Sequence, residues 1–165
     1  MRMLKYENYN IKDYYLLGDE IMNIRKYRED EIEELVELWY DVSIKAHSFI
    51  SDDYWRAGKK DMREKYIPMS ATYVIEDNEE IIGFVSIVDD YLAAIFIGTN
   101  YQDKGYGNKL LDYIKTKKDY IELRVYKKNE KTVKFYLKND FHIQEESIDE
   151  LTGEEEFLMV WNKEK

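Results

Sequence analysis

The chain has 165 residues, of which 44% are hydrophobic and 36% charged, and it carries a formal net charge of −10. This length suits one domain with a single core, and no apolar run approaches the roughly 20 residues that a membrane-spanning helix needs. The chain has no cysteine and only two histidines, which excludes disulfides and a cysteine nucleophile and gives no basis for a metal site. Because no signal-peptide pattern opens the chain, we expect a soluble, cytoplasmic protein that does not bind membranes.

The first 21 residues are rich in Tyr and Asn and are interpreted as an extension of the domain. A packed helix, an oligomer contact and a start-site artefact are all open interpretations of this segment. The domain itself is expected to span residues 22–165 and to begin with a strand at Met22–Tyr27.

Two helices are predicted next. Apolar residues recur with the 3.6-residue period of one helix face over Glu29–Ile44, and acidic residues cover much of the rest. The aromatic segment His47–Ile50 predicts a bend. Ser51 is a suitable N-cap for a second helix, which ends near Lys65.

The middle of the chain has the pattern of strands. Ala71–Glu76 and Ile81–Val88 flank a polar segment that is typical of a hairpin, and Tyr91–Ile97 is so apolar that we expect a central strand buried on both faces. Together with the elements that follow, this order predicts an α/β (α+β) fold with a mixed, mostly antiparallel central sheet and helices on both faces. Those elements are a helix that contains Leu110, Leu111 and Ile114, a strand at Tyr120–Val125, a helix at Glu130–Lys138, and strands at Phe141–Glu146 and Glu156–Trp161.

A glycine-rich turn between the apolar strand and the next helix is the strongest chemical signal. Three of the seven glycines, Gly98, Gly105 and Gly107, fall within ten residues of each other. Glycine lets the backbone approach a ligand closely, and a helix N-terminus offers unpaired N–H groups to a phosphate. An ordinary tight turn would also need these glycines. The pattern is neither a P-loop nor a Rossmann fingerprint, because the lysine-hydroxyl ending and the third glycine are absent.

The charge distribution agrees with an anionic ligand at this turn. From Gly98 to Asp140 the chain carries 11 basic and 6 acidic residues, whereas the remainder is strongly acidic. A basic segment inside an acidic protein favours binding of an anion there, although a solvated helix end would have the same composition.

Two motifs resemble those of the GNAT superfamily of acetyl-CoA-dependent N-acetyltransferases. Gln102-x-x-Gly105-x-Gly107 is similar to the acetyl-CoA motif of that superfamily, and the segment Asn129–Phe141 is similar to its Asn-x-x-Ala-x-x-Phe-Tyr-x-Lys-x-Gly-Phe pattern. Within the superfamily, the chain resembles small bacterial acetyltransferases of unsettled substrate. Thr132 and Asp140 depart from the usual Ala and Gly of the second motif, and neither departure touches the phosphate loop.

The resemblance implies acetyl-CoA as co-substrate and an arm of that molecule lying between two strands that splay apart. Backbone groups of Phe96 and Ile97 are then expected to hold the arm, and Asn129 is expected to contact it from the next helix. Tyr136 matches the general acid that protonates the leaving thiolate after direct attack by a primary amine. The pyrophosphate is expected on the loop formed by Gln102, Asp103, Lys104, Gly105, Tyr106, Gly107 and Asn108.

The acceptor side is less defined by the sequence. The resemblance places the bend at His47 beside the acceptor, where His47 is a candidate base or acceptor contact or else a satisfied structural residue. Trp39, Phe49 and Trp55 either line an acceptor pocket or fill the core. The acceptor is expected to be a small-molecule or peptide amine, and the acidic charge is compatible with a cationic one. The resemblance also allows a homodimer.

Two other functions compete with the enzyme. One is a catalytically silent domain that binds or senses acyl-CoA, because a fold does not fix a function. The other is an acetyltransferase toxin that acts on charged tRNA. The net charge of −10 counts against the second, since an RNA-binding surface should be basic, and we expect no nucleic-acid partner.

Overall fold

The computed structural model describes residues 14–17 and 20–163. They form an eight-stranded sheet in the order β1-β2-β3-β4-β5-β6-β8-β7. Every neighbouring pair is antiparallel except β5 and β6, so the predicted mixed, mostly antiparallel sheet is confirmed. The strands are β1 Tyr14–Leu17, β2 Glu20–Lys26, β3 Ala71–Asp77, β4 Glu80–Val88, β5 Tyr91–Ile97, β6 Tyr120–Tyr126, β7 His142–Ile148 and β8 Glu155–Asn162.

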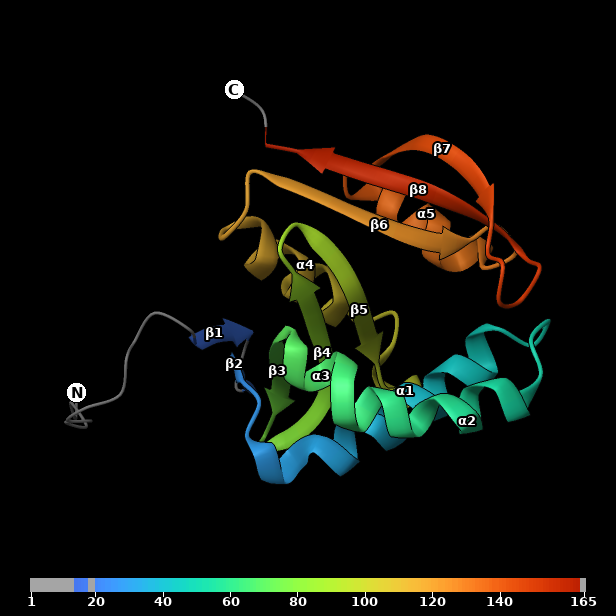
Figure 1. Ribbon diagram of the computed structural model, residues 1–165. Helices are drawn as coiled ribbons and strands as arrows, with labels where there is room; N and C mark the ends of the chain where they lie inside the picture. Colours follow the sequence, from blue (N-terminus) through green and yellow to red (C-terminus); the bar gives the residue numbers. More distant parts are fainter. Residues whose placement is uncertain (1–13, 18–19, 164–165) are drawn as a thin grey trace, which may run out of the picture.

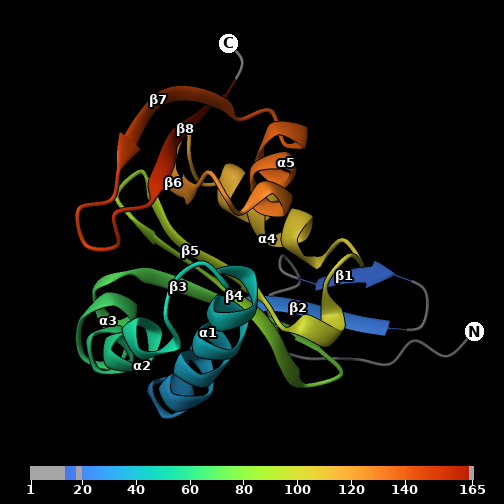
Figure 2. The same cartoon turned by 90° about the vertical axis from the view of Figure 1, so that its right-hand side faces the viewer.

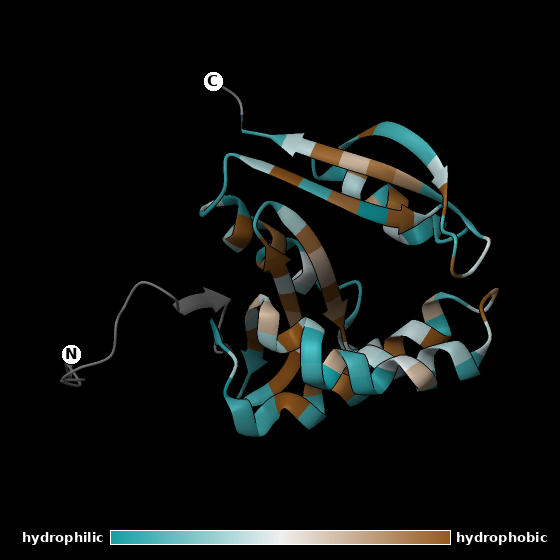
Figure 3. Ribbon diagram, viewed as in Figure 1, coloured by the Kyte–Doolittle hydropathy of each residue, from teal (hydrophilic) through white to brown (hydrophobic). Residues whose placement is uncertain are grey.

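Helices cover both faces of this sheet, as predicted (Figures 1 and 2). One face carries α1 Ile32–Ala46, α2 Asp52–Asp61 and α3 Ile67–Met69, and the other carries α4 Tyr106–Lys115 and α5 Glu130–Lys138. Apolar residues follow the strands between the two helix layers (Figure 3), where they form two core clusters. None of the helices formed by the described residues is long and apolar enough to cross a membrane.

Local sequence signals account for the first helices. The side chain of Ser51 accepts a hydrogen bond from the backbone N–H of Asp53 at 3.2 Å, which confirms it as the N-cap of α2. The predicted second helix continues past α2 through a π-helical turn at Met62–Tyr66. Part of the predicted N-terminal extension is described: β1 pairs with β2 at the sheet edge, and residues 1–13 and 18–19 lie outside the described residues.

The expectation that Tyr91–Ile97 is buried on both faces was wrong. Within β5 only Leu92 is fully buried, and the residues after it are half-buried or exposed. The reason is that β5 and β6 pair only at Tyr91 and Glu122 and then separate. Ala93 lacks a partner in the β4–β5 ladder, since Ile87 pairs with Leu92 and Ser86 with Ala94. Such a bulge bends a strand, and here the bend follows directly on the last contact with β6.

Candidate active site

The opening between β5 and β6 exposes backbone groups of β5. The N–H of Gly98 donates to the carbonyl of Ile82 at 2.8 Å, and antiparallel ladders alternate between residues that bond to the partner strand and residues that face away. The backbone of Phe96 therefore faces β4, whereas the backbone of Ile95 and Ile97 faces the opening. The ladder thus favours Ile97 over Phe96 for a backbone contact with a ligand, and it adds Ile95, which the motif alone did not indicate.

The other wall of the opening is β6. The N–H of Glu122 donates to the carbonyl of Asp90 at 2.9 Å, and Glu122 is the one residue of β6 that pairs with β5. The next residue of β6 with the same orientation is Arg124, and its backbone makes a hydrogen bond with the phenol of Tyr91. The phenol of Tyr91 therefore lies beside β6 where the two strands begin to separate. Sequence reasoning missed this residue.

The glycine turn lies where β5 leads into α4. Gly105 is the N-cap of α4 and has a φ of 87°, a left-handed conformation that side chains other than glycine adopt with strain. A Cβ atom built at Gly105 would have no neighbour within 4 Å, so open space lies beside the helix N-terminus. Unpaired N–H groups and a partial positive charge at that terminus suit a phosphate, and the turn therefore fits an anionic group.

Side chains of the turn point away from this space and fix its shape. The hydroxyl of Tyr106 donates to Asp77 at 3.1 Å, and the amide of Gln102 donates to the carbonyl of Ile97 at 3.0 Å. Asn108 accepts a hydrogen bond from Asn139 at the end of α5. These residues can therefore offer an anion their backbone N–H groups rather than their side chains.

Three further contacts adapt the turn to its surroundings. Lys131 lies 2.9 Å from the carboxylate of Asp103, which neutralises the one acidic group of the loop. A Cβ atom at Gly107 would lie 3.4 Å from the ring of Phe135. Gly107 therefore allows α4 and α5 to approach each other closely, a role separate from phosphate binding. Lys104 lies over the ring of Tyr101, at 5.7 Å from its centroid.

Asn129 and His47 join the two sides of the opening. Asn129 Oδ1 accepts from the N–H of Thr132 at 3.4 Å, which makes it the N-cap of α5, and its Nδ2 therefore faces His47 Nε2 at 3.3 Å. His47 Nδ1 lies 3.0 Å from the carbonyl of Ser43. Both contacts require a neutral imidazole with its proton on Nδ1. Burial lowers the pKa of His47, which favours the same neutral form.

The side of the opening next to His47 is lined by aromatic rings. The ring of His47 is stacked on Trp55 at 4.9 Å and lies edge-on to Phe49 and Tyr126. Tyr126 lies at the end of β6, and its hydroxyl donates a hydrogen bond to Asp149 at 2.6 Å. This contact connects β6 to the β7–β8 loop. Two atoms here, Ser43 Oγ and Trp55 Nε1, are buried without a hydrogen-bond partner among the described residues. This side therefore has polar capacity that the described protein groups do not use.

Tyr136 lies in the core beneath the opening. Its side chain is 5% exposed, and its ring contacts Phe135 and Phe141. Burial raises the pKa of the phenol well above its ordinary value of 10.0, and the nearby Tyr91 raises it further. Tyr136 is therefore fully protonated at neutral pH and holds a proton near Tyr91, where β5 and β6 begin to separate.

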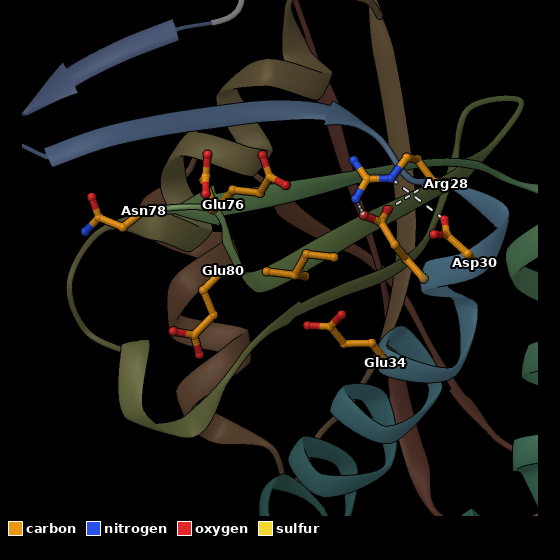
Figure 4. Close-up of a pocket in the computed structure, with 9 residues that line it drawn as sticks. Arg28, Asp30, Glu34, Glu76, Asn78 and Glu80 are labelled. Atoms are coloured by element: carbon orange, nitrogen blue, oxygen red, sulfur yellow. Dashed lines mark hydrogen bonds and ion pairs between the residues drawn. The ribbon is translucent and has the colours of Figure 1, made fainter.

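Other predicted candidates have structural roles. Trp39 is buried in the core beneath α1 and packs edge-on against Trp55. An acidic pocket of about 520 Å³ lies at the opposite end of α1 from His47 (Figure 4). Burial and the carboxylates of Glu31 and Glu80 raise the pKa of Glu34 there. The length of α1 separates this pocket from His47 and the aromatic rings around it.

The lowered pKa of His47 predicts a pH-dependent stability. Because the unfolded chain binds a proton to this residue more readily than the folded one, stability should be complete above about pH 6.5 and decline as the pH falls towards the folded-state pKa. The free energy of unfolding of His47→Gln, measured with urea, should not show this decline. The exposed His142 provides the control His142→Gln, which should keep the wild-type decline. Equal pH profiles for wild type and His47→Gln would contradict the neutral, buried imidazole.

Comparison with known sequences supports a transferase. The model of the acetyltransferase (GNAT) domain matches residues 68–143. Peptidyl-lysine N-acetyltransferase YiaC of Escherichia coli (strain K12) is 30% identical over 139 residues, which cover 84% of this chain and 95% of that protein. Peptidyl-lysine N-acetyltransferase YjaB of the same strain is 27% identical over 133 residues, covering 79% of this chain and 90% of that protein.

Solved structures share the fold. The solution structure of apo YjaB from Escherichia coli has a TM-score of 0.76 at 24% identity and covers 87% of this chain and 99% of that one. The PaiA N-acetyltransferase from Thermoplasma acidophilum was solved in complex with coenzyme A. It has a TM-score of 0.72 at 22% identity, and the match covers 86% of this chain and 98% of that one. With a relative 30% identical over nearly its whole length, the chain belongs to the GNAT acetyltransferase family and is an acetyl-CoA-dependent N-acetyltransferase.

Proposed function

We propose that the protein transfers the acetyl group of acetyl-CoA to the side-chain amine of lysine residues in peptides or proteins. The observation that carries this proposal is the opening between β5 and β6, which has the anion-binding turn at Gly105 on the α4 face of the sheet and the aromatic side of His47 and Tyr126 on the α1 and α2 face. The relatives named as peptidyl-lysine N-acetyltransferases support lysine as the acceptor. The net charge of −10 suits a cationic acceptor.

The proposed cofactor contacts follow from the backbone. The N–H groups at the start of α4 hold the pyrophosphate, and the open-facing groups of Ile95 and Ile97 hydrogen-bond the arm. Asn129 contributes from the N-terminus of α5. The catalytic unit is residues 22–165, to which β1 adds one edge strand. The homodimer remains a prediction.

In this proposal the reaction needs no covalent enzyme intermediate. Bound acetyl-CoA supplies an activated thioester, and the lysine amine forms the new C–N bond as the C–S bond breaks. Tyr136 donates its phenolic proton to the departing thiolate, and the proton that the nitrogen loses as the amide forms returns to the phenolate through solvent. The burial that raises the pKa of Tyr136 also raises the pKa of a thiol in the same surroundings. The pKa values of the proton donor and the proton acceptor therefore shift in the same direction.

His47 has a positioning role in this scheme. Its two ring nitrogens lie against Ser43 and Asn129, so neither is directed at an acceptor amine in this arrangement. By holding Asn129, the imidazole links the bend after α1 to the N-terminus of α5, which carries Tyr136. The acceptor ammonium must lose its proton to solvent or to another group before it attacks.

Release of coenzyme A across a panel of acceptors tests this function. We expect turnover with peptides that contain one lysine and much slower turnover with the same peptides after the lysine is replaced by norleucine, which lacks the amine. A matched panel of polyamines, aminoglycosides and free amino acids provides the comparison. Faster turnover of any of these classes than of the lysine peptides would contradict the proposed acceptor.

A further inference from the structure

A lysine of the protein's own chain, in the loop after β6, contacts the two other segments that border the acceptor side. Lys128 follows β6, and its Nζ lies 2.8 Å from Oε2 of Glu154 in the β7–β8 loop. The same ammonium lies 5.4 Å from the centroid of the Phe49 ring, in the bend after α1. Lys128 therefore bridges the loop before α5, the bend after α1 and the β7–β8 loop.

The carboxylate of Glu154 and the ring of Phe49 form a site for one cation, and the surrounding residues hold both groups in place. The side chain of Glu154 is 18% exposed, whereas that of Lys128 is 60% exposed. The ring of Phe49 is held edge-on by His47 and Tyr126, each at 5.8 Å. An aromatic ring beside a carboxylate is an arrangement that binds ammonium groups. Lys128 is thus the exposed and exchangeable member of the group.

We propose that Glu154 and Phe49 form the subsite for the ammonium of the incoming acceptor lysine, and that Lys128 fills this subsite when no acceptor is bound. This inference rests on the proposed function and names the residues that recognise its substrate. Lys128 and an acceptor lysine carry the same charged group, so they compete for one carboxylate. Exposed ion pairs and exposed cation–π contacts are both weak, and an acceptor can therefore displace Lys128.

Calorimetric binding of a single-lysine peptide to the enzyme saturated with coenzyme A tests the subsite without turnover. Lys128→Gln removes the competitor, so affinity for the peptide should rise about threefold to tenfold. Glu154→Gln removes the carboxylate and should weaken binding by a similar factor. Lys128→Arg keeps the charge and the ring contact, so it should bind the peptide like the wild type.

A neighbouring ion pair provides matched controls. Lys127 pairs with Glu146 at 3.0 Å and lies 3.9 Å from the carboxylate of Glu155, so Lys127→Gln and Glu155→Gln make the same charge changes one residue away and should leave peptide affinity unchanged. If Lys128→Gln binds the peptide no more tightly than Lys127→Gln does, the subsite is wrong. The affinities could change as expected while neither the wild type nor any variant acetylates the peptide. That result would contradict the proposed function and would still support the ammonium subsite.

Discussion

Replacement of Tyr136 by Phe is expected to lower kcat by a factor of about 10² to 10⁴, the usual contribution of a general acid. The substitution removes one hydroxyl and keeps the ring that packs against Phe135 and Phe141. Affinity for acetyl-CoA should stay within about twofold, because the proton is needed only as the C–S bond breaks. Stopped-time assays of coenzyme A release with a lysine peptide measure kcat, and calorimetry measures cofactor affinity.

A second buried tyrosine provides the control for Tyr136. Tyr113 on α4 is 7% exposed and belongs to the same core cluster, so Tyr113→Phe makes the same chemical change away from the opening. It should leave kcat unchanged. A loss of cofactor affinity in Tyr136→Phe with normal kcat would assign Tyr136 to binding, and no change in either quantity would make it a packing residue.

Replacement of Gly105 by Val is expected to weaken acetyl-CoA binding at least about tenfold. At a φ of 87° a branched side chain strains the turn, and it projects into the open space beside the helix N-terminus, where a phosphate would bind. Calorimetric titration with acetyl-CoA gives the affinity, and circular dichroism shows whether the variant is folded. Unchanged affinity in a folded Gly105→Val would reject the anion-binding turn.

The best control for this substitution lies in the β7–β8 loop. Gly153 also has a positive φ, of 75°, and no neighbour within 4 Å of its Cβ position. Gly153→Val therefore strains a turn to a similar degree away from the phosphate turn, and it should bind acetyl-CoA like the wild type. Gly107 is a poorer probe, because a side chain there meets the ring of Phe135 and disturbs helix packing.

The sequence predicted local features well, because they depend on neighbouring residues. The periodicity of Glu29–Ile44 matches α1, and the polar segment between Ile75 and Ile81 matches the hairpin of β3 and β4. The glycine spacing placed the turn and the start of α4 correctly. These signals are short-range, so one sequence is enough to read them.

Features that depend on distant contacts could not be predicted in the same way. His47 meets Asn129 across 82 positions, and Tyr126 meets Asp149 across 23, and neither pair leaves a local pattern. The apolar run at Tyr91–Ile97 predicts a fully buried strand, because composition does not show that the neighbouring strand β6 separates from it. The separation begins beside a bulge at Ala93, which only the sheet register makes visible.

A crystal structure with acetyl-CoA is the most direct test of the central claim, which is that the opening between β5 and β6 holds the acetyl donor above Tyr136. We predict that the pyrophosphate lies on the N–H groups at the start of α4 beside Gly105. The arm should pass between the strands and hydrogen-bond the backbone of Ile97, with the thioester sulfur within reach of the Tyr136 hydroxyl. A cofactor bound outside this opening, or a sulfur directed away from Tyr136, would contradict the assignment of the site.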